Sequence, residues 1–197
     1  MKRRIAFFDF DGTITTRDTL LEIIKFHRGR PLFYLGFLLN TPFLLAFKLG
    51  LISNYSAKQR VLRFFFRNMP LTEFQSRCDQ FGIGTLPSLI RPKATQEIQK
   101  LREGGATVVI ISASAGNWIS HWAATLDIPL LATNLEVQNE RITGRIEGRN
   151  CYGPEKVNRI QAAYDLSAYD EVYCYGDSGG DKEMLELANR KFYKPFR

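Results

Sequence analysis

The chain contains few cysteines and histidines, which limits the kinds of site it can build. Its 197 residues include three cysteines, at positions 78, 151 and 174, and no CxxC pair. We therefore expect neither a disulfide framework nor a zinc site, and a reducing, cytoplasmic environment is the default. The two histidines, His27 and His121, have no ligand-like spacing, so we interpret both as structural or surface residues.

Long runs of like charge are absent too, and no nucleic-acid-binding motif occurs, so we expect no nucleic-acid partner. Lys and Arg together number 27 and Asp and Glu number 20, which gives a net charge of +7. This balance suits anionic substrates or a membrane surface, and a solvated basic surface explains it equally well. The start, MKRRIAFFDFDG, has an apolar stretch that is too short for a signal peptide.

Short apolar runs alternate with helical patterns from about residue 85 onward, which predicts an α/β fold with a parallel sheet and helices on both faces. A hairpin is expected over residues 135–146, with its turn at Asn139-Glu140 beside the sheet. The five predicted strands cover residues 5–8, 107–112, 129–132, 171–175 and 191–194, and helices are expected over residues 93–102 and 118–126.

The first two predicted strands lie about 95 residues apart in the chain, far more than a single crossover helix needs. We therefore expect an inserted, mostly helical subdomain over residues 15–84. Residues 1–14 and 85–197 would then form the core that carries the sheet.

Polar side chains gather where the predicted strands end. In a parallel sheet these ends meet at one edge, where ligands bind. A lysine in the first turn of a helix that begins at Pro154 is unusual, because helix starts favour acidic residues. The side chains that we expect at this edge are those of Asp9, Asp11, Ser112, Lys156, Asp177 and Asp181.

Carboxylates crowded at one place repel each other unless a cation lies among them. Mg²⁺ binds hard oxygen ligands and often bridges carboxylates to a substrate phosphate. Asp9 and Asp11 point to the same side of an extended chain, so one can attack phosphorus while the other protonates the leaving oxygen. Lys156, Ser112 and the metal would neutralise the charge of the transferred phosphoryl group.

Four segments resemble, in order and spacing, the motifs of the haloacid dehalogenase (HAD) superfamily of phosphohydrolases: FDFDGTIT, VVIISAS, the lysine of GPEKV, and YGDSGGD. The insert resembles a helical C1 cap, and the hairpin NERITGRIEG resembles that of the phosphoserine-phosphatase-like subfamily IB. The resemblance implies a HAD-like Rossmannoid sheet and a Mg²⁺-dependent phosphomonoester hydrolase that works through an aspartyl-phosphate.

The resemblance also implies a role for each matching residue. Asp9 would be the nucleophile and Asp11 the general acid and base. Ser112 and Lys156 would hold the phosphoryl oxygens. The other implied substrate contacts are Thr13 and Ala113, together with Asp18 and Arg60, which fall near the positions that bind the amino acid in phosphoserine phosphatases. The implied metal ligands are Asp9, the backbone carbonyl of Asp11, Asp177 and Asp181. Asp181 could alternatively support Lys156.

Substrate choice should come from the insert, which contains an uncharged stretch from Pro31 to Phe47. This stretch is slightly short for a membrane span. Thr41 as helix cap and Pro42 as first helical residue predict two short helices instead. The stretch has basic flanks, so residues 31–52 could contact a membrane surface, pack internally or form a dimer face.

The substrate and the exact reaction stay open at this point. Membrane contact would favour a lipid-linked phosphate, and internal packing would favour a small ester such as phosphoserine. There are two alternatives. One is a phosphotransferase that uses the same intermediate, and the other is a membrane-peripheral binding module that retains the fold without the activity. The protein would accordingly be cytoplasmic or membrane-associated, and its oligomeric state is unknown.

Overall fold

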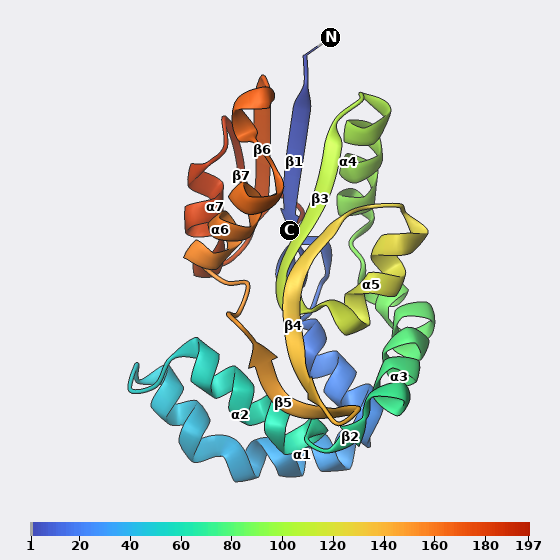
Figure 1. Ribbon diagram of the computed structural model, residues 1–197, viewed down its shortest axis with the longest axis vertical. Coiled ribbons are helices and arrows are strands. Elements are labelled where there is room, and N and C mark those ends of the chain that lie inside the picture. The colour runs from blue at the N-terminus through green and yellow to red at the C-terminus, as the bar shows by residue number, and fades with distance from the viewer. Residues whose placement is uncertain (1) are drawn as a thin grey trace.

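The computed structural model describes residues 2–197 and contains one seven-stranded sheet (Figure 1). The strand order is β2-β5-β4-β3-β1-β6-β7. The five strands from β4 to β7 run parallel, as predicted, whereas β5 and β2 add to the β4 edge in antiparallel fashion. The bounds are β1 Arg4–Asp9, β2 Met69–Pro70, β3 Thr107–Ala115, β4 Leu130–Gln138, β5 Arg141–Glu147, β6 Glu171–Gly176 and β7 Arg190–Tyr193.

Helices cover both faces of the sheet, because side chains of its central strand alternate between two apolar clusters. Ala6 and Phe8 of β1 pack into the cluster that includes α4 (Pro92–Glu103) and α5 (Gly116–Thr125). Ile5 and Phe7 pack into the cluster on the other side, with residues of α6 (Pro154–Ala163) and α7 (Lys182–Glu186). Short helical turns cover Phe10–Ile14, Leu86–Leu89, Leu166–Ala168 and Gly179–Asp181.

The predicted hairpin is present, but it is part of the sheet and not a separate unit beside it. Strand β4 continues through it, and a register shift between Leu135 and Val137 bends the strand away from the core. Asn139 and Glu140 both have positive φ angles, 48° and 57°, as a tight hairpin turn requires.

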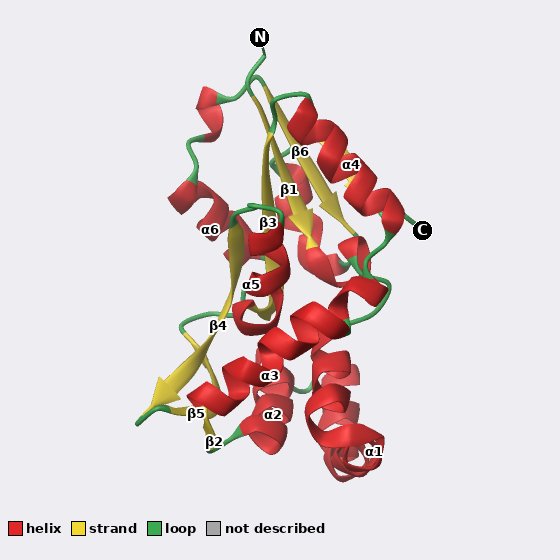
Figure 2. Ribbon diagram, turned by 90° about the vertical axis from the view of Figure 1, so that its right-hand side faces the viewer, coloured by secondary structure: helices red, strands yellow, loops and turns green. Residues whose placement is uncertain are grey.

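Three helices lie across the carboxyl ends of the parallel strands (Figures 1 and 2). They are α1 (Thr19–Lys48), α2 (Asn54–Phe66) and α3 (Leu71–Gly84), and all three fall within the predicted insert. We call this group the cap. The division of the chain at residues 14 and 85 stays a prediction.

The break in α1 is not where the sequence analysis put it. The helix is interrupted at Gly29, whose φ is 74°, and it then continues through Thr41 and Pro42. The Thr41 hydroxyl donates to the Phe37 carbonyl at 3.0 Å, so it bonds within the helix and does not cap a new one. Gly29 tolerates the positive φ, which explains the break there.

Candidate active site

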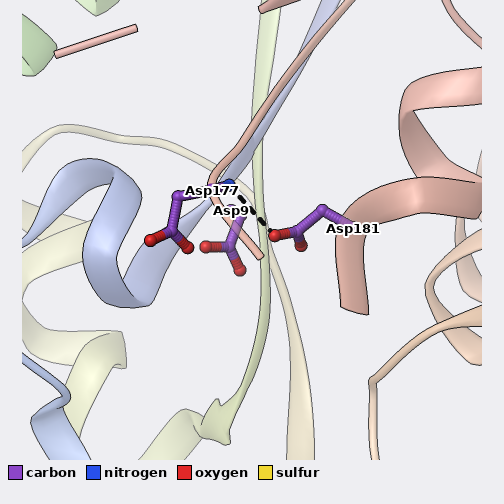
Figure 3. A group of neighbouring side chains, drawn as sticks. All are labelled: Asp9, Asp177 and Asp181. Atoms are coloured by element: carbon purple, nitrogen blue, oxygen red, sulfur yellow. Dashed lines mark hydrogen bonds between the residues drawn. The ribbon is translucent and has the colours of Figure 1, made fainter. Parts of the chain in front are cut away.

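Three carboxylates converge at the carboxyl edge of the sheet (Figure 3). Asp9 is the last residue of β1, and Asp177 and Asp181 follow β6. Each offers one oxygen, and these oxygens lie within 4.8 Å of one another. Gly12 belongs to the same arrangement, because a Cβ at that position would collide with the Asp177 carboxylate.

Lys156 is buried among these carboxylates. Its Nζ donates to Asp9 Oδ1 at 2.5 Å, to Asp181 Oδ1 at 2.6 Å and to the Ile111 carbonyl at 3.3 Å. Burial by itself lowers the pKa of Lys156, but the two carboxylates outweigh burial and raise that pKa above its ordinary value. The first-turn lysine therefore contacts the acidic cluster directly.

The acidic cluster has more negative charge than Lys156 neutralises. Burial, assisted by the charges of Asp181 and Asp11, raises the pKa of Asp9 to about 7 in spite of Lys156. Burial also raises the pKa of Asp177, whose carboxylate binds the Arg197 guanidinium. A group of crowded carboxylate oxygens of this kind fits a divalent cation that prefers oxygen ligands.

Asp181 also orders the loop that holds Asp177. Its Oδ2 accepts from the backbone N–H groups of Asp177 at 3.1 Å and Ser178 at 3.0 Å, and from the Ser178 hydroxyl at 2.8 Å. Burial would raise the pKa of Asp181, but Lys156 and Ser178 lower it below the ordinary value. Asp181 thus stays charged and supports both Lys156 and the loop.

Asp11 turns away from this cluster and toward the cap. Its Oδ1 accepts from the Thr19 backbone N–H at 2.7 Å and from the Thr19 hydroxyl at 2.6 Å. The Trp118 indole N–H donates to the same hydroxyl at 3.0 Å. The first residue of α1 therefore fixes the carboxylate that the sequence analysis assigned to proton transfer, a contact that no motif predicted.

The predicted phosphoryl contacts lie around Asp9. The Thr13 hydroxyl donates to Asp9 Oδ2 at 3.0 Å. Ser112 is fully buried, and its Oγ accepts from the Ser114 backbone N–H at 3.0 Å. Ala113 and Ser114 line the adjoining cavity. The motif VVIISAS lies within β3, which pairs with β1 and places Ile111 opposite Asp9.

A cavity of about 400 Å³ leads from the carboxylates into the cap. Asp9, Asp11, Asp181 and Lys156 form its inner end, with Tyr152 and Ser178 nearby. Most of the cap residues that line it are apolar: Leu20, Leu21, Phe37, Leu44, Phe47, Ala57 and Val61.

The structure brings only one of the two predicted cap contacts to this cavity. Asp18 lines it and also caps α1, since its Oδ1 accepts from the Leu20 N–H at 2.9 Å. Arg60 lies elsewhere, with its guanidinium 4.2 Å from the Phe43 ring centroid and bonded to Asn40. The cause is helical rotation: Ala57 and Val61 face the cavity, whereas Arg60 is on the other side of α2.

Lys58 is the cap cation that lines the cavity, and the sequence analysis missed it. Its Nζ donates to the Ala113 carbonyl and, at 3.1 Å, to Asn150 Oδ1. Burial lowers the pKa of Lys58 to about 8, although Asp11 and Asp18 oppose that change. A lone lysine on a helix has no sequence signature, but the amphipathic pattern of α2 could have indicated which side it occupies.

The fold and the site together describe a protein class: a parallel α/β sheet with an aspartate at the end of its central strand, a buried lysine beside that aspartate, and a cluster of three carboxylates. The chain belongs to the haloacid dehalogenase-like hydrolases, whose family pattern matches residues 6–186. The family resemblance and the α/β fold that the sequence analysis gave are therefore confirmed.

Similar proteins cover nearly the whole chain. Protein CicA of Caulobacter vibrioides is 33% identical over 192 residues, which span 96% of this chain and 85% of that protein. A protein of unknown function from Bordetella pertussis Tohama I has a similar structure, with a TM-score of 0.81, 22% identity, and coverage of 97% and 89%. A phospho-aspartyl intermediate analogue of phosphoserine phosphatase shares the fold, with a TM-score of 0.64, 18% identity, and coverage of 97% and 86%.

Proposed function

We propose that this hydrolase is a Mg²⁺-dependent phosphomonoesterase that forms an aspartyl-phosphate on Asp9. The observation that carries the proposal is the contact between the nearly buried Asp9 and Lys156, within an acidic cluster that fits a divalent cation. Two comparisons support the proposal: the match to the haloacid dehalogenase-like family, and the phospho-aspartyl intermediate analogue described for phosphoserine phosphatase.

The residues divide the reaction into two displacements. Asp9 attacks phosphorus, and the P–O bond to the alcohol breaks while Asp11 protonates the leaving oxygen. Water then attacks the phosphorus of the aspartyl-phosphate, Asp11 takes a proton from that water, and phosphate leaves Asp9 free. Lys156 lies where it can balance the charge of the phosphoryl oxygens. Asp9, Asp177 and Asp181 would hold Mg²⁺, which would supply positive charge to the site.

The cavity favours an ester with an apolar alcohol part. Phe37, Leu44 and Val61 line the space through which the substrate would extend from Asp9. A zwitterion such as phosphoserine would find Asp18 and Lys58 there, but it would leave the apolar wall unused. Within the two substrate types that the sequence left open, we therefore favour a lipid-linked phosphate. Such a substrate would bring residues 31–52 close to a membrane surface.

Replacement of Asp9 by Asn tests the chemistry. We expect hydrolysis of a generic aryl phosphate to fall by roughly 10⁴-fold or more, because the nucleophile is lost. EDTA should abolish the wild-type activity and added Mg²⁺ should restore it. Asp127→Asn is the matched control, since Asp127 is exposed and its positive φ suits asparagine. Activity retained in Asp9→Asn would contradict the proposal.

A phosphotransferase is the second candidate, because the apolar cavity could also hold an acceptor alcohol after the first displacement. The aspartyl-phosphate would then pass its phosphoryl group to that alcohol instead of water. Incubation with an aryl phosphate and hexanol distinguishes the two reactions. Hexyl phosphate as product indicates transfer, and inorganic phosphate alone indicates hydrolysis.

A further inference from the structure

Beyond its break at Gly29, helix α1 leaves one side uncovered by the rest of the protein. Leu38 is 68% exposed and Leu45 is 53% exposed, and both lie on this side. The opposite side of the same helix carries Phe37 and Leu44, which line the cavity. We call this uncovered side, together with the exposed leucines that follow the helix, the apolar cap face. It comprises Leu32, Tyr34, Leu35, Leu38, Leu39, Phe43 and Leu45 of α1, and Leu49 and Leu51 after it.

A face of this kind needs an explanation, because soluble monomers rarely expose large contiguous apolar patches. Helix α1 is long and apolar enough to cross a membrane by length and composition. However, the first part of the helix packs inside the protein, where Ile23 and Ile24 are fully buried. A spanning arrangement would also remove Phe37 and Leu44 from the cavity wall. The helix therefore fits a position along a membrane surface better than one across it.

Charge indicates what covers the apolar cap face. Residues 23–72 contain eight Lys and Arg and no Asp or Glu, while the whole chain carries +7. This quarter of the molecule thus holds all of the excess positive charge, and the remainder is close to neutral. A covering partner should therefore be both apolar and anionic.

Part of that positive charge forms a row beside the apolar cap face. Arg60, Arg63 and Arg67 line a shallow hollow on α2 together with the exposed ring of Phe64. Within residues 2–197, none of the ion pairs includes these three arginines. Arg60 also lies over the ring of Phe43, so the row is continuous with the apolar cap face.

We propose that the cap docks the protein on a lipid bilayer that contains anionic lipids. The apolar cap face enters the boundary between headgroups and acyl chains, and the arginine row binds the headgroups. A second copy of the chain is a poorer partner, because a symmetric dimer through this face would bring two strongly cationic segments together. Docking goes beyond the proposed function, since it requires no turnover.

Vesicle flotation tests the docking directly. The probes are vesicles of phosphatidylcholine alone and vesicles in which about one third of the lipid is phosphatidylglycerol. We expect wild-type protein to float with the anionic vesicles and not with the neutral ones, and salt should weaken the binding. Arg63→Gln/Arg67→Gln should reduce the partition coefficient roughly thirtyfold, because two cations near the surface are lost. Leu38→Glu/Leu45→Glu should reduce it by roughly a hundredfold or more.

The matched control is Lys93→Gln/Lys100→Gln on α4, which removes the same charge from exposed positions outside the cap. This variant should bind like wild type. Circular dichroism and turnover of a soluble aryl phosphate should be unchanged in all three double variants, which separates docking from folding and catalysis. Docking is overturned by wild type that does not bind anionic vesicles, by cap variants that bind like wild type, or by a control that loses binding equally. It is also overturned by a wild-type dimer that Leu38→Glu/Leu45→Glu dissociates.

Discussion

The carboxyl edge of the sheet and the cap differ in whether their charged side chains form ion pairs within the protein. At the edge, Lys156 is buried in direct contact with Asp9 and Asp181, so opposite charges meet within the protein. In the cap, cations outnumber carboxylates over a long segment, and the arginine row of α2 forms no ion pairs within residues 2–197. The edge thus pairs its charges within the protein, whereas the cap leaves an excess of positive charge without carboxylate partners among the residues that the structure describes.

Removal of Lys156 should weaken both catalysis and stability at the edge. Lys156→Met leaves two buried carboxylates without their cation, and we expect turnover of an aryl phosphate to fall by roughly 10³-fold. The free energy of unfolding in EDTA should fall by about 3 kcal/mol, because a buried charge loses its partner. Steady-state kinetics and urea denaturation measure the two effects.

Lys100→Met is the control for this variant. Lys100 forms an ion pair with Glu97 at 3.9 Å, and its side chain is 80% exposed. A surface pair of this kind contributes little, so we expect a change below about 0.5 kcal/mol and unaltered turnover. If the two lysine variants lost equal stability, the contrast between the buried edge and the open surface would be wrong.

Neighbouring leucines of α1 test whether the helix has two distinct sides. Leu44 lines the cavity and Leu45 belongs to the apolar cap face. Leu44→Gln should lower kcat/KM for hexyl phosphate by about tenfold, because an apolar contact with the alcohol part is lost. Leu45→Gln should leave that value unchanged when no vesicles are present. Equal losses in both variants would show that the cavity does not select the alcohol part.

Thr19 connects the two regions, because it is the first residue of α1 and its hydroxyl bonds Asp11 of the core. Thr19→Val should lower kcat by about tenfold with little change in KM, since Asp11 loses the hydroxyl donor and keeps only the backbone N–H of residue 19. Thr19→Ser should recover most of the loss. Thr16→Val is the control, because the Thr16 hydroxyl bonds the Leu89 carbonyl and not Asp11. A change in KM alone would assign Thr19 to substrate binding.

The core residues could be predicted from the sequence because adjacent parallel strands bring residues that are far apart in the chain close together. Asp9, Ser112 and Asp177 each follow an apolar run, and parallel strands bring such ends to one edge. Lys156 was found for a similar reason, since Pro154 marks the start of its helix. These residues depend on backbone topology, which short apolar runs indicate directly.

The cap was harder to predict because its contacts depend on how each helix is rotated. The expected cation was Arg60, whereas Lys58 lines the cavity, two positions away on α2. The expected helix break was at Pro42, whereas Gly29 supplies it. Helix periodicity identifies an apolar side but not the element it faces, so the side that carries Lys58 could be read from the sequence whereas its position at the cavity could not. The break at Gly29 did have a signal, because Pro31 follows that glycine two residues later.

The smallest expected effect is on the pH dependence of stability, and it comes from His27 in the interior of the cap. This side chain is 7% exposed, it lies against the rings of Phe66 and Phe74, and neither ring nitrogen has a hydrogen-bond partner. Burial, with smaller contributions from Arg77 and Arg28, lowers the pKa of His27 to about 4. His27 therefore stays neutral in the folded protein at pH values where it binds a proton in the unfolded chain.

The sign of the pH effect follows from this difference. Between pH 6.5 and pH 4 the unfolded state binds the proton more readily, so acidification removes stability, by about 1–2 kcal/mol from this group. Urea denaturation at pH 7 and pH 4.5 measures how much free energy of unfolding is lost on acidification. This loss should be about 1–2 kcal/mol smaller in His27→Leu than in wild type. Phe26→Leu alters the same aromatic cluster without removing a titrating group, so its loss between the two pH values should equal that of wild type. If His27→Leu lost as much stability on acidification as wild type, the pKa of His27 would have to be the same in the folded and unfolded states, and burial would not lower it.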